Sequence, residues 1–271
     1  MWTLQNGLGS TINIEWIEEG FQSTIELAGH KHVSESGLVT FFDDGAQYDK
    51  VRSVFSAVID QSKMTELENF YNADRDGDFT LITNSQEGLA LFSPAFGDGG
   101  AFVFKIQSMK QTGALNKEIY KYFRVEFSVL AVGFPTYSPS LGNDEGKIQI
   151  GTIGGIRYPV NDFELSIQMD VGAEQTGFGV AYVNDWEEQN EKTKFTLRLL
   201  HDKMSLLLKN LRTIRYGELL LSVPSEVYPF GAKQGNFLSF QTRLLNTKLI
   251  VTQIKNKRYE LTLELQRLSS E

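Results

Sequence analysis

Apolar and polar residues alternate with a period of two along most of this chain, and this alternation constrains the fold more than any other feature. Successive side chains of a β-strand point to opposite faces of the sheet, so such alternation is typical of strands with one buried face. It is clearest in four segments, Ile12–Trp16, Phe123–Val129, Phe195–Leu199 and Tyr259–Leu265. The 24 glycines, three of them directly after an aspartate, favour hairpin turns. The sequence therefore predicts a mostly β protein.

Two segments, Ser62–Ala73 and Asp202–Arg212, have the apolar spacing of an amphipathic helix instead. We expect Ser62 and Asp202 to act as N-caps, because their side-chain oxygens can accept hydrogen bonds from first-turn amides. We also expect each apolar stripe to pack against a sheet. The stripes are Met64, Leu67, Phe70 and Tyr71 in the first segment, and Met204, Leu207, Leu208 and Leu211 in the second.

The two helical segments lie within a longer stretch of similarity that aligns Phe55 with Phe195 and continues without a gap. Seven of the 27 positions in 55–81 are identical in this alignment, and strand, helix, glycine turn and strand recur in the same order. Near the ends of the halves, Arg124–Val129 matches Arg258–Leu263 at a slightly shorter offset. These matches predict an internal duplication. The alternative is one large β-sandwich with two unrelated helices.

A duplicated chain needs a connector, and residues 134–146 supply a segment rich in glycine and proline. We therefore predict a first β domain over 1–133 and a second over 147–271, each a β-sandwich or barrel with one amphipathic helix. The connector is too short for a free tether, so it is expected to cross from one packed unit to the next.

Charge is distributed unevenly between the predicted domains. Residues 1–135 hold 10 Lys/Arg and 18 Asp/Glu, a net charge of −8, and residues 136–271 hold 16 of each. An acidic first half argues against a nucleic-acid or anionic-membrane surface. The sequence shows no apolar run near the about 18 residues of a membrane span and no secretory signal. These features indicate a soluble protein made in the cytosol.

Chemical motifs are scarce. The absence of cysteine excludes thiolate sites and cysteine nucleophiles, and the sequence has no phosphate-binding loop and no nucleophile elbow. His30 and His32 lack a third histidine nearby, and His201 is expected at a helix start. We therefore predict no catalytic residue, no cofactor, no metal and no enzyme activity.

The segment Asn72–Phe79 resembles the start of a calcium loop, with acids at alternate positions and Gly77 at the sixth. Thr83 stands where the loop requires a bidentate glutamate, and the second half keeps Gly217 without the acids. We expect an acidic exposed turn rather than a calcium site. The basic run at 255–258 is expected to form a hairpin tip.

The order of strands, the single helix in each half, the turn glycines Gly77 and Gly217 and the alternating final strands together resemble the phage tail-tube fold. This fold is shared by tail tubes, distal tail proteins and baseplate hubs of tailed phages and contractile injection systems. The resemblance implies a ring around a central channel, built by sheet-edge pairing, with an acidic lining that suits the first half. It implies no catalytic residues.

On this basis the expected function is a structural component of a phage tail or baseplate, located in the virion tail and assembled in the host cytoplasm. The expected partners are further copies, in a trimeric or hexameric ring, and neighbouring tail or baseplate proteins. We expect the edges to be the strands that hold Arg124 and Glu126 in one half and Arg258 and Glu260 in the other. The alternatives are a tandem glycan- or protein-binding module, with an aromatic platform near Trp186, and a carboxylate-based hydrolase.

Overall fold

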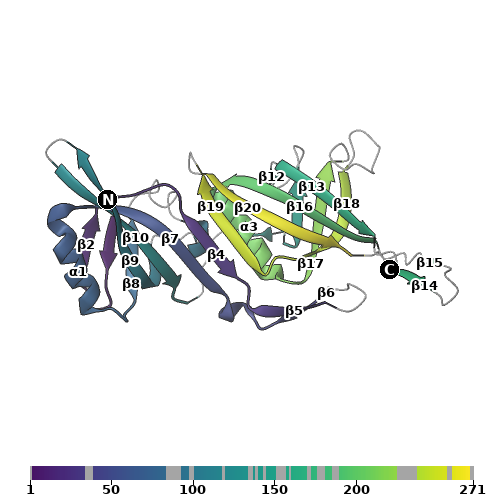
Figure 1. The fold of residues 1–271 in the computed structure, drawn as a ribbon, viewed down its shortest axis with the longest axis horizontal. Helices are drawn as coiled ribbons and strands as arrows, with labels where there is room; N and C mark the ends of the chain where they lie inside the picture. Colours follow the sequence, from purple (N-terminus) through teal and green to yellow (C-terminus); the bar gives the residue numbers. More distant parts are fainter. Residues whose placement is uncertain are drawn as a thin grey trace.

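The structure is a computed structural model of the chain. It describes residues 2–33, 39–83, 93–97, 101–117, 120–133, 137, 140–142, 145–150, 157–158, 160–169, 172–175, 181–184, 189–224, 237–254 and 258–268. Within these residues the protein is mostly β, with two α-helices and one large mixed sheet of 16 strands (Figure 1). The predicted fold class is confirmed at this level. No helix in the described part has both the length and the apolar composition needed to cross a membrane.

The described part of the N-terminal half contains strands β1 to β10 and the first helix. The elements are β1 (Trp2–Gln5), β2 (Thr11–Ile14), β3 (Trp16–Ile17), β4 (Gln22–Glu26), β5 (Gly29–Val33), β6 (Val39–Asp43), η1 (Ala46–Tyr48), β7 (Lys50–Asp60), η2 (Gln61–Lys63), α1 (Met64–Ala73), β8 (Phe79–Thr83), η3 (Pro94–Phe96), β9 (Ala101–Lys117) and β10 (Tyr120–Ala131).

The C-terminal half contains the other described strands and the second helix. The elements are β11 (Lys147–Ile150), β12 (Arg157–Tyr158), β13 (Val160–Met169), β14 (Gly172–Gln175), β15 (Ala181–Asn184), β16 (Gln189–Leu200), α3 (His201–Ile214), β17 (Glu218–Pro224), β18 (Phe237–Leu244), β19 (Lys248–Ile254) and β20 (Arg258–Arg267).

Strands pair in the same order in the two halves. In the N-terminal half the order is β7-β10-β9-β8, and in the C-terminal half it is β16-β20-β18-β17. Each helix connects the first strand of its group to the last, and each first strand also pairs antiparallel with an earlier strand, β4 or β13. A separate two-stranded hairpin, β5–β6 or β14–β15, lies between those two strands in the chain.

The register of these pairings corrects one predicted match, that of Arg124 with Arg258. Arg124 is opposite Val58 in the β10–β7 pair. The alignment of Phe55 with Phe195 makes Arg198 the counterpart of Val58, and Arg198 is opposite Glu260 in the β16–β20 pair. Arg124 therefore corresponds to Glu260. A slip of this kind, by two positions, preserves the face on which side chains lie, so alternation alone could not detect it.

Both helices bury the predicted stripes. In α1, Leu67 and Phe70 are buried, while Met64 and Tyr71 are partly buried against the core. In α3, Met204, Leu207, Leu208 and Leu211 are all buried. Phe70 contacts Phe79 of β8 with ring centroids 5.7 Å apart. Helical spacing therefore predicted the face that each helix turns towards the core.

The predicted N-caps are wrong. Asp60 accepts a hydrogen bond from the Ser62 backbone N–H at 2.8 Å, because the short helix η2 precedes α1 and moves the cap upstream. A bond from the Ser62 hydroxyl and this backbone bond lower the pKa of Asp60. The N-cap of α3 lies two positions earlier than predicted, at Leu200, and Asp202 is exposed in the first turn.

The glycine in the turn after each helix lies close to neighbouring atoms and does not have a left-handed backbone. A Cβ on Gly77 would collide with the carboxylate of Asp74, and one on Gly217 would lie 3.0 Å from the Ile214 carbonyl oxygen. Neither glycine has a positive φ, whereas Arg215 has a φ of 55°. The predicted turn is confirmed, with a different reason for its glycine.

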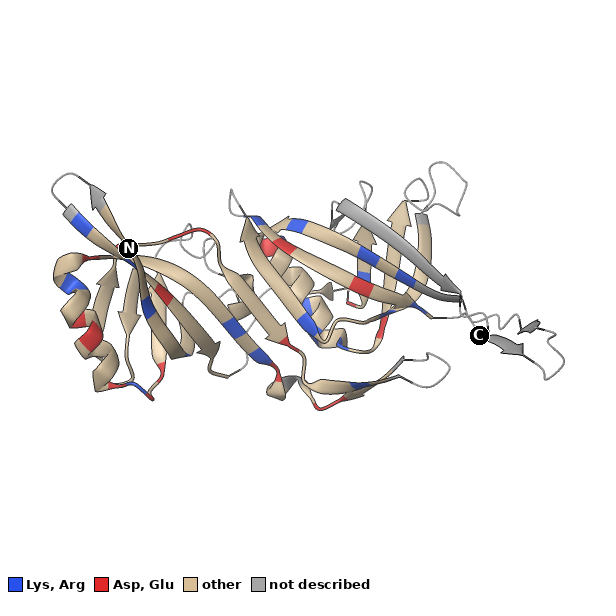
Figure 2. Cartoon of the chain, in the orientation of Figure 1, with Lys and Arg blue, Asp and Glu red and all other residues tan. Residues whose placement is uncertain are grey.

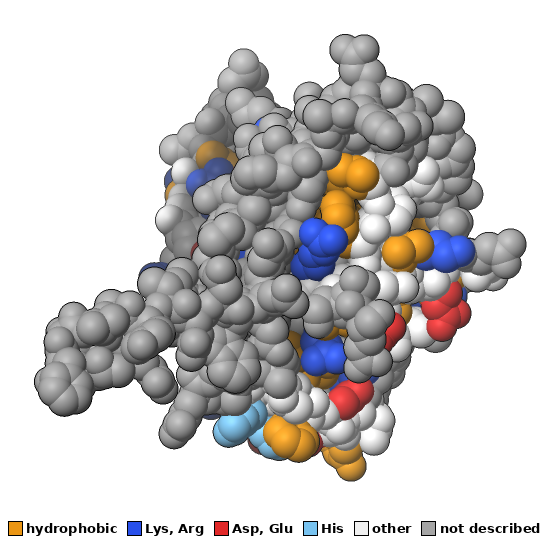
Figure 3. Space-filling view, turned by 90° about the vertical axis from the view of Figure 1, so that its right-hand side faces the viewer, with side chains coloured by type: hydrophobic (Ala, Val, Ile, Leu, Met, Phe, Trp, Pro, Cys, Tyr) orange, Lys and Arg blue, Asp and Glu red, His pale blue; other side chains and the backbone are white. Residues whose placement is uncertain are grey.

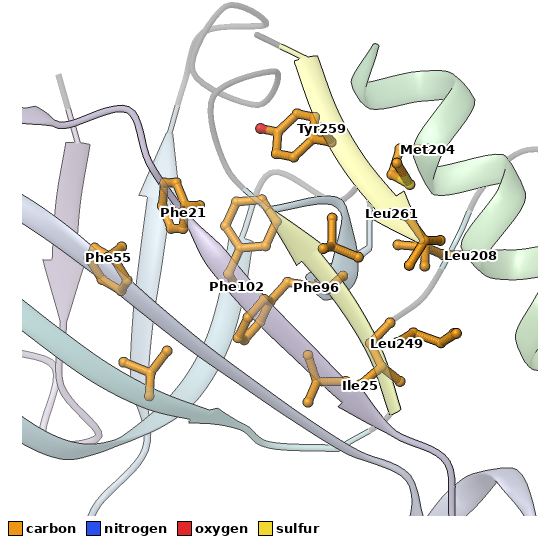
Figure 4. Packing of buried hydrophobic residues seen from close by; sticks show 14 of the residues in the cluster. Phe21, Ile25, Phe55, Phe96, Phe102, Met204, Leu208, Leu249, Tyr259 and Leu261 are labelled. Atoms are coloured by element: carbon orange, nitrogen blue, oxygen red, sulfur yellow. The ribbon is translucent and has the colours of Figure 1, made fainter. Parts of the chain in front are cut away.

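The buried hydrophobic residues form one continuous cluster through both halves. Figure 4 shows Phe21, Ile25 and Phe102 of the N-terminal half beside Leu249 and Tyr259 of the C-terminal half. Such clusters usually mark one core per folding unit. The two halves are therefore packed together through apolar side chains as well as through the shared sheet.

Candidate assembly interface

Strand β4 joins the two halves into one sheet. It pairs antiparallel with β7 on one side and with β19 on the other, and it lies between the two groups of strands in Figure 1. In the β4–β19 register, Glu26 is opposite Lys248, Ile25 is opposite Leu249 and Thr24 is opposite Ile250. The contact between the halves is therefore a backbone-paired strand junction.

Side chains along this junction support the pairing. Ile25, Leu249 and Val251 are almost fully buried on the inner face. On the outer face, Lys248 Nζ lies 3.2 Å from a carboxylate oxygen of Glu26. Cross-strand pairs of these kinds stabilise a sheet by roughly 0.2–1 kcal/mol each. The junction thus combines an apolar inner face with an ion pair on its exposed face.

Gln253 of β19 fastens the chain at the start of β4. Its side-chain oxygen accepts hydrogen bonds from the backbone N–H groups of Gly20, at 3.0 Å, and Phe21, at 3.4 Å. Its side-chain nitrogen donates to the Tyr259 hydroxyl at 3.4 Å. Burial raises the pKa of the Tyr259 phenol. These bonds tie the start of β4 to β19 and β20.

A buried cluster of charged residues holds the start of β7 against the end of α3. Asp49 has a fully buried side chain, and its carboxylate lies 3.3 Å from Arg212 Nε and 2.8 Å from Arg215 Nη1. Arg215 also binds Asp43 at 2.8 Å. The two aspartates come from the N-terminal half and the two arginines from the C-terminal half. The cluster therefore fixes the halves relative to one another.

An aromatic contact lies beside this cluster. The rings of Phe41 and Tyr216 are stacked with centroids 4.5 Å apart, and the Tyr216 hydroxyl donates to the Leu27 carbonyl at 3.1 Å. Desolvation raises the pKa of Tyr216. Gly29 has a φ of 144°, and a Cβ there would collide with the Phe42 carbonyl oxygen and lie 2.8 Å from the Tyr216 ring. The base of the β5–β6 hairpin thus requires glycine to pack against Tyr216.

The connector between the halves contacts both of them at Tyr137. Its hydroxyl donates to the carbonyl of Ala95 in η3 at 3.1 Å, and its own carbonyl accepts from Lys209 of α3 at 3.1 Å. Arg212 lies over its ring, 5.8 Å from the centroid. Much of the predicted 134–146 connector lies outside the described residues, but Tyr137 is packed rather than free.

The predicted interface strands are not sheet edges. Strand β10 pairs with β7 and β9, and β20 pairs with β16 on one side and with β18 and β19 on the other. Their backbone groups are therefore used within the chain, and the prediction that they pair with a neighbour is wrong. Clean alternation and the absence of proline describe central strands as well as edge strands, so the sequence held no signal that separates them.

The four predicted interface side chains lie on the outer faces of these central strands. Arg124 forms two bonds to Glu18, at 2.5 and 2.8 Å, and Arg198 binds Glu260 at 2.7 Å. Arg258 is exposed and Glu126 is partly buried. Figure 2 shows positive and negative residues side by side across β16 and β20. Whether these side chains meet another molecule stays a prediction.

Two strands do present one unpaired side among the described residues. Residues 105–117 of β9 pair with β10 alone, because β8 reaches only as far as Phe104. Strand β13 pairs only with β16. Unpaired strand edges are templates for a further strand. Local alternation does not identify either edge, because an edge is defined by the partners of every neighbouring strand.

A polar hollow of about 400 Å³ lies over the exposed face of β16, β19 and β20. Its two carboxylates are each ion-paired, Glu260 with Arg198 at 2.7 Å and Glu264 with Lys194 at 3.5 Å. This arrangement differs from the pair of facing acids that a carboxylate-based hydrolase needs. The hollow is a charged sheet face on which cations and carboxylates alternate.

The residues considered for metal binding occupy separate places. His30 and His32 are exposed on β5, and histidine is visible at the surface in Figure 3. His201 is buried at the start of α3, 5.8 Å between ring centroids from Tyr259. In the described part of the chain, no three His, Asp or Glu side chains come together as metal ligands.

The acidic turn after α1 has a structural contact. Asp74 accepts a hydrogen bond from the Gly7 backbone N–H at 2.7 Å, which docks the β1–β2 turn onto the helix end. Lys105 lies 3.7 Å from Asp78 and donates to the Asp76 carbonyl at 3.0 Å. Asp76 and Asp78 are exposed. The described geometry is that of an exposed acidic turn, as expected.

Comparison with known proteins gives distant structural matches only. No family model matches the sequence, and no curated protein matches it. A chain from the virion of a native gene transfer agent particle aligns with a TM-score of 0.28 and 16% identity over 49% of this chain and 91% of its own. A tail protein from Neisseria meningitidis MC58 aligns with a TM-score of 0.36 and 6% identity over 98% of this chain and 96% of its own. Scores of this size do not establish a shared fold or function.

Proposed function

We propose that this protein is a structural component of a phage tail, or of a tube or baseplate like those of contractile injection systems, and that its copies assemble into a ring around a central channel. The observation that carries the proposal is the order of strand pairing, β7-β10-β9-β8 in one half and β16-β20-β18-β17 in the other. In this proposal each half is one β unit, and the chain provides two quasi-equivalent positions of the ring.

Agreement in several independent elements supports the two-unit proposal. A helix follows the first strand of each group, and a hairpin precedes it. The turn after each helix carries the same bond, from Gly77 N–H to the Asp74 carbonyl at 2.9 Å and from Gly217 N–H to the Ile214 carbonyl at 2.8 Å. These matching bonds add to the agreement between the two halves.

The way the halves join supports assembly rather than a self-contained fold. The β4–β19 junction uses one edge of the first unit and a different edge of the second. Contacts between two different surfaces are heterologous, and repeating them generates rings or filaments. Three chains would supply six positions, which gives the trimeric ring, and six chains the hexameric one.

The location and partners follow from this assignment. The protein would be part of the virion tail, assembled in the host cytoplasm, and would contact neighbouring tail or baseplate proteins as well as its own copies. The acidic first half, with a net charge of −8 over 1–135, suits an acidic channel lining. The two structural matches come from a virion and a tail protein, but their TM-scores are too low to add weight.

The alternative of a glycan- or protein-binding module gains no specific observation. The aromatic platform expected for it centres on Trp186, which lies outside the described residues. We therefore retain a single proposed function.

Mass measurement tests the proposal directly. Light scattering after size exclusion, from low micromolar protein to the highest soluble concentration, should give multiples of the 30.6 kDa chain mass. Negative-stain electron microscopy of the largest species should show closed rings with a central hole. A monomer at every concentration, with no rings on the grids, would overturn the proposal.

A further inference from the structure

We propose, as a consequence of the proposed ring assembly, that the chain carries two ends of one repeating contact. The unpaired side of β13 in one molecule pairs antiparallel with the unpaired side of β9 in a second copy of this chain. The register is the one by which β4 pairs with β19 inside the chain. The internal junction is thus the template for the contact between molecules.

Strands β4 and β13 are equivalent by their partners. Each pairs antiparallel with the long strand that precedes a helix, and each is followed by a separate hairpin. Thr24 is opposite Arg52 of β7, and Ser166 is opposite Lys192 of β16, the counterpart of Arg52 in the second half. Thr24 therefore corresponds to Ser166. The other side of β4 pairs with β19, whereas no described strand pairs with the equivalent side of β13.

Strands β19 and β9 are equivalent in the same way. Val251 is opposite Leu261 of β20, and Gln111 is opposite Val125 of β10. Leu261 is opposite Leu197 of β16, and Val125 is opposite Ala57 of β7. Positions 197 and 57 are equivalent in the alignment of the two halves, so Leu261 corresponds to Val125. Counting back one position matches Ile250 with Lys110. The side of β19 that β4 occupies is thus the side that β9 leaves unpaired.

Transferring the internal register places four residue pairs opposite one another. The pairs, written as a β9 residue and a β13 residue of the second copy, are Ser108 with Gln168, Met109 with Ile167, Lys110 with Ser166 and Gln111 with Leu165. The two register shifts of β9, which bracket residues 108–111, leave this stretch regular.

The chemistry of the two segments is compatible with pairing. Neither segment contains proline, so every backbone N–H remains a donor. No two residues of like charge are directly opposite one another in this register. Met109 is partly buried and Lys110 exposed, as Leu249 and Ile250 are buried and exposed in β19.

The proposed contact is head to tail, because each molecule offers β9 to one neighbour and β13 to the other. It has only part of the buried cluster found at the internal junction: Asn72 and Asp76 stand where Arg212 and Tyr216 stand in the second half, and Arg75 alone matches Arg215. The contact between molecules is therefore weaker than the internal one. Assembly should depend on concentration, while the chain itself stays folded.

Disulfide cross-linking tests the register, and the chain is suited to it because it has no native cysteine. A Lys110→Cys protein is mixed with a separate Ser166→Cys protein under mild oxidation. Residues directly opposite in an antiparallel pair have Cα atoms about 4.5–5.5 Å apart, within the range of a disulfide. The mixture should form covalent dimers, and neither protein should form them alone.

Matched variants define the register and guard against misfolding. When the Lys110→Cys protein is mixed with a Glu164→Cys or a Gln168→Cys protein instead, the cross-linked fraction should be about tenfold lower. The reason is that paired strands hold only directly opposite thiols at millimolar effective concentration. Ser108→Cys with Gln168→Cys is a second in-register pair. Thr24→Cys combined with Ile250→Cys in one chain is the internal control. This protein should form a disulfide within the chain and no covalent dimer.

The outcomes separate this inference from the proposed function. A doubly substituted Lys110→Cys and Ser166→Cys chain should give a covalent ladder that ends at the ring size. Oligomers detected by light scattering, without cross-linking of either in-register pair, would overturn the β9–β13 contact and leave the ring proposal standing. Equal cross-linking at 164, 166 and 168 would overturn the register. Monomers without cross-links would overturn both proposals.

Discussion

At the scale of single residues, the buried charge cluster shows how a carboxylate can be stabilised inside the junction between the halves. Asp49 has no exposed side-chain surface, and burying a carboxylate costs several kcal/mol unless cations and donors compensate it. Arg212, Arg215 and the Ala28 backbone N–H, which donates to it at 2.8 Å, supply that compensation. Removing the carboxylate leaves two buried guanidinium groups without this partner.

We predict that Asp49→Ala lowers the free energy of unfolding by about 3–5 kcal/mol, the range for breaking a buried ion pair from one side. Chemical denaturation measures it. Asp44→Ala is the matched control, because Asp44 is exposed in the same region, and it should change stability by less than about 0.5 kcal/mol. Equal effects of the two substitutions would mean that the cluster does not hold the halves together.

At the scale of elements, each helix is held by its apolar stripe rather than by its ends. Neither α1 nor α3 has a side-chain hydrogen bond at its own N-cap residue, whereas the stripe residues Leu67 and Leu207 are completely buried. Most helical stability in proteins comes from packing of such a face. The face could be predicted from spacing. The caps could not, because η2 inserts a turn that shifts the start of α1.

Truncating the stripe should therefore be costly. Leu207→Ala is predicted to destabilise the protein by about 2–5 kcal/mol, through lost burial and the cavity left behind. Thermal unfolding followed by circular dichroism measures the loss. Lys203→Ala, at an exposed position of the same helix, should remain within about 0.5 kcal/mol of the parent. A small effect of Leu207→Ala would show that α3 is not docked on the sheet.

At the scale of the whole molecule, the continuous core and the β4–β19 junction couple the two halves. Two separately folded domains would have separate cores and a polar linker between them. Here the connector residue Tyr137 contacts elements of both halves. Unfolding either half exposes apolar surface of the other.

The protein should consequently unfold in one cooperative transition, studied under dilute conditions that favour the single chain. Differential scanning calorimetry is expected to give a calorimetric enthalpy equal to the van't Hoff enthalpy. Leu207→Ala in the C-terminal half and Leu67→Ala in the N-terminal half should each move the whole transition. Two resolved transitions, with each substitution shifting only one, would contradict the coupling.

The sequence by itself determined the local features of this protein. The four alternating segments, the two helices, their buried faces and the turns after them follow from periodicity and glycine placement, because those patterns record which side of an element meets apolar surroundings. The recurrence of Phe55 and Leu67 as Phe195 and Leu207 was visible for the same reason.

Only the tertiary structure decided which strands are central and which have a free side. Strand β10 and the outer part of β9 both alternate, yet among the described residues one has two partner strands and the other has one. Strand β4, near the start of the chain, meets β19, near its end, and Asp49 meets Arg212 from the other half. Pairing partners are set by how all elements pack together, and a slip of two positions leaves every side chain on its face. Local pattern therefore cannot specify them.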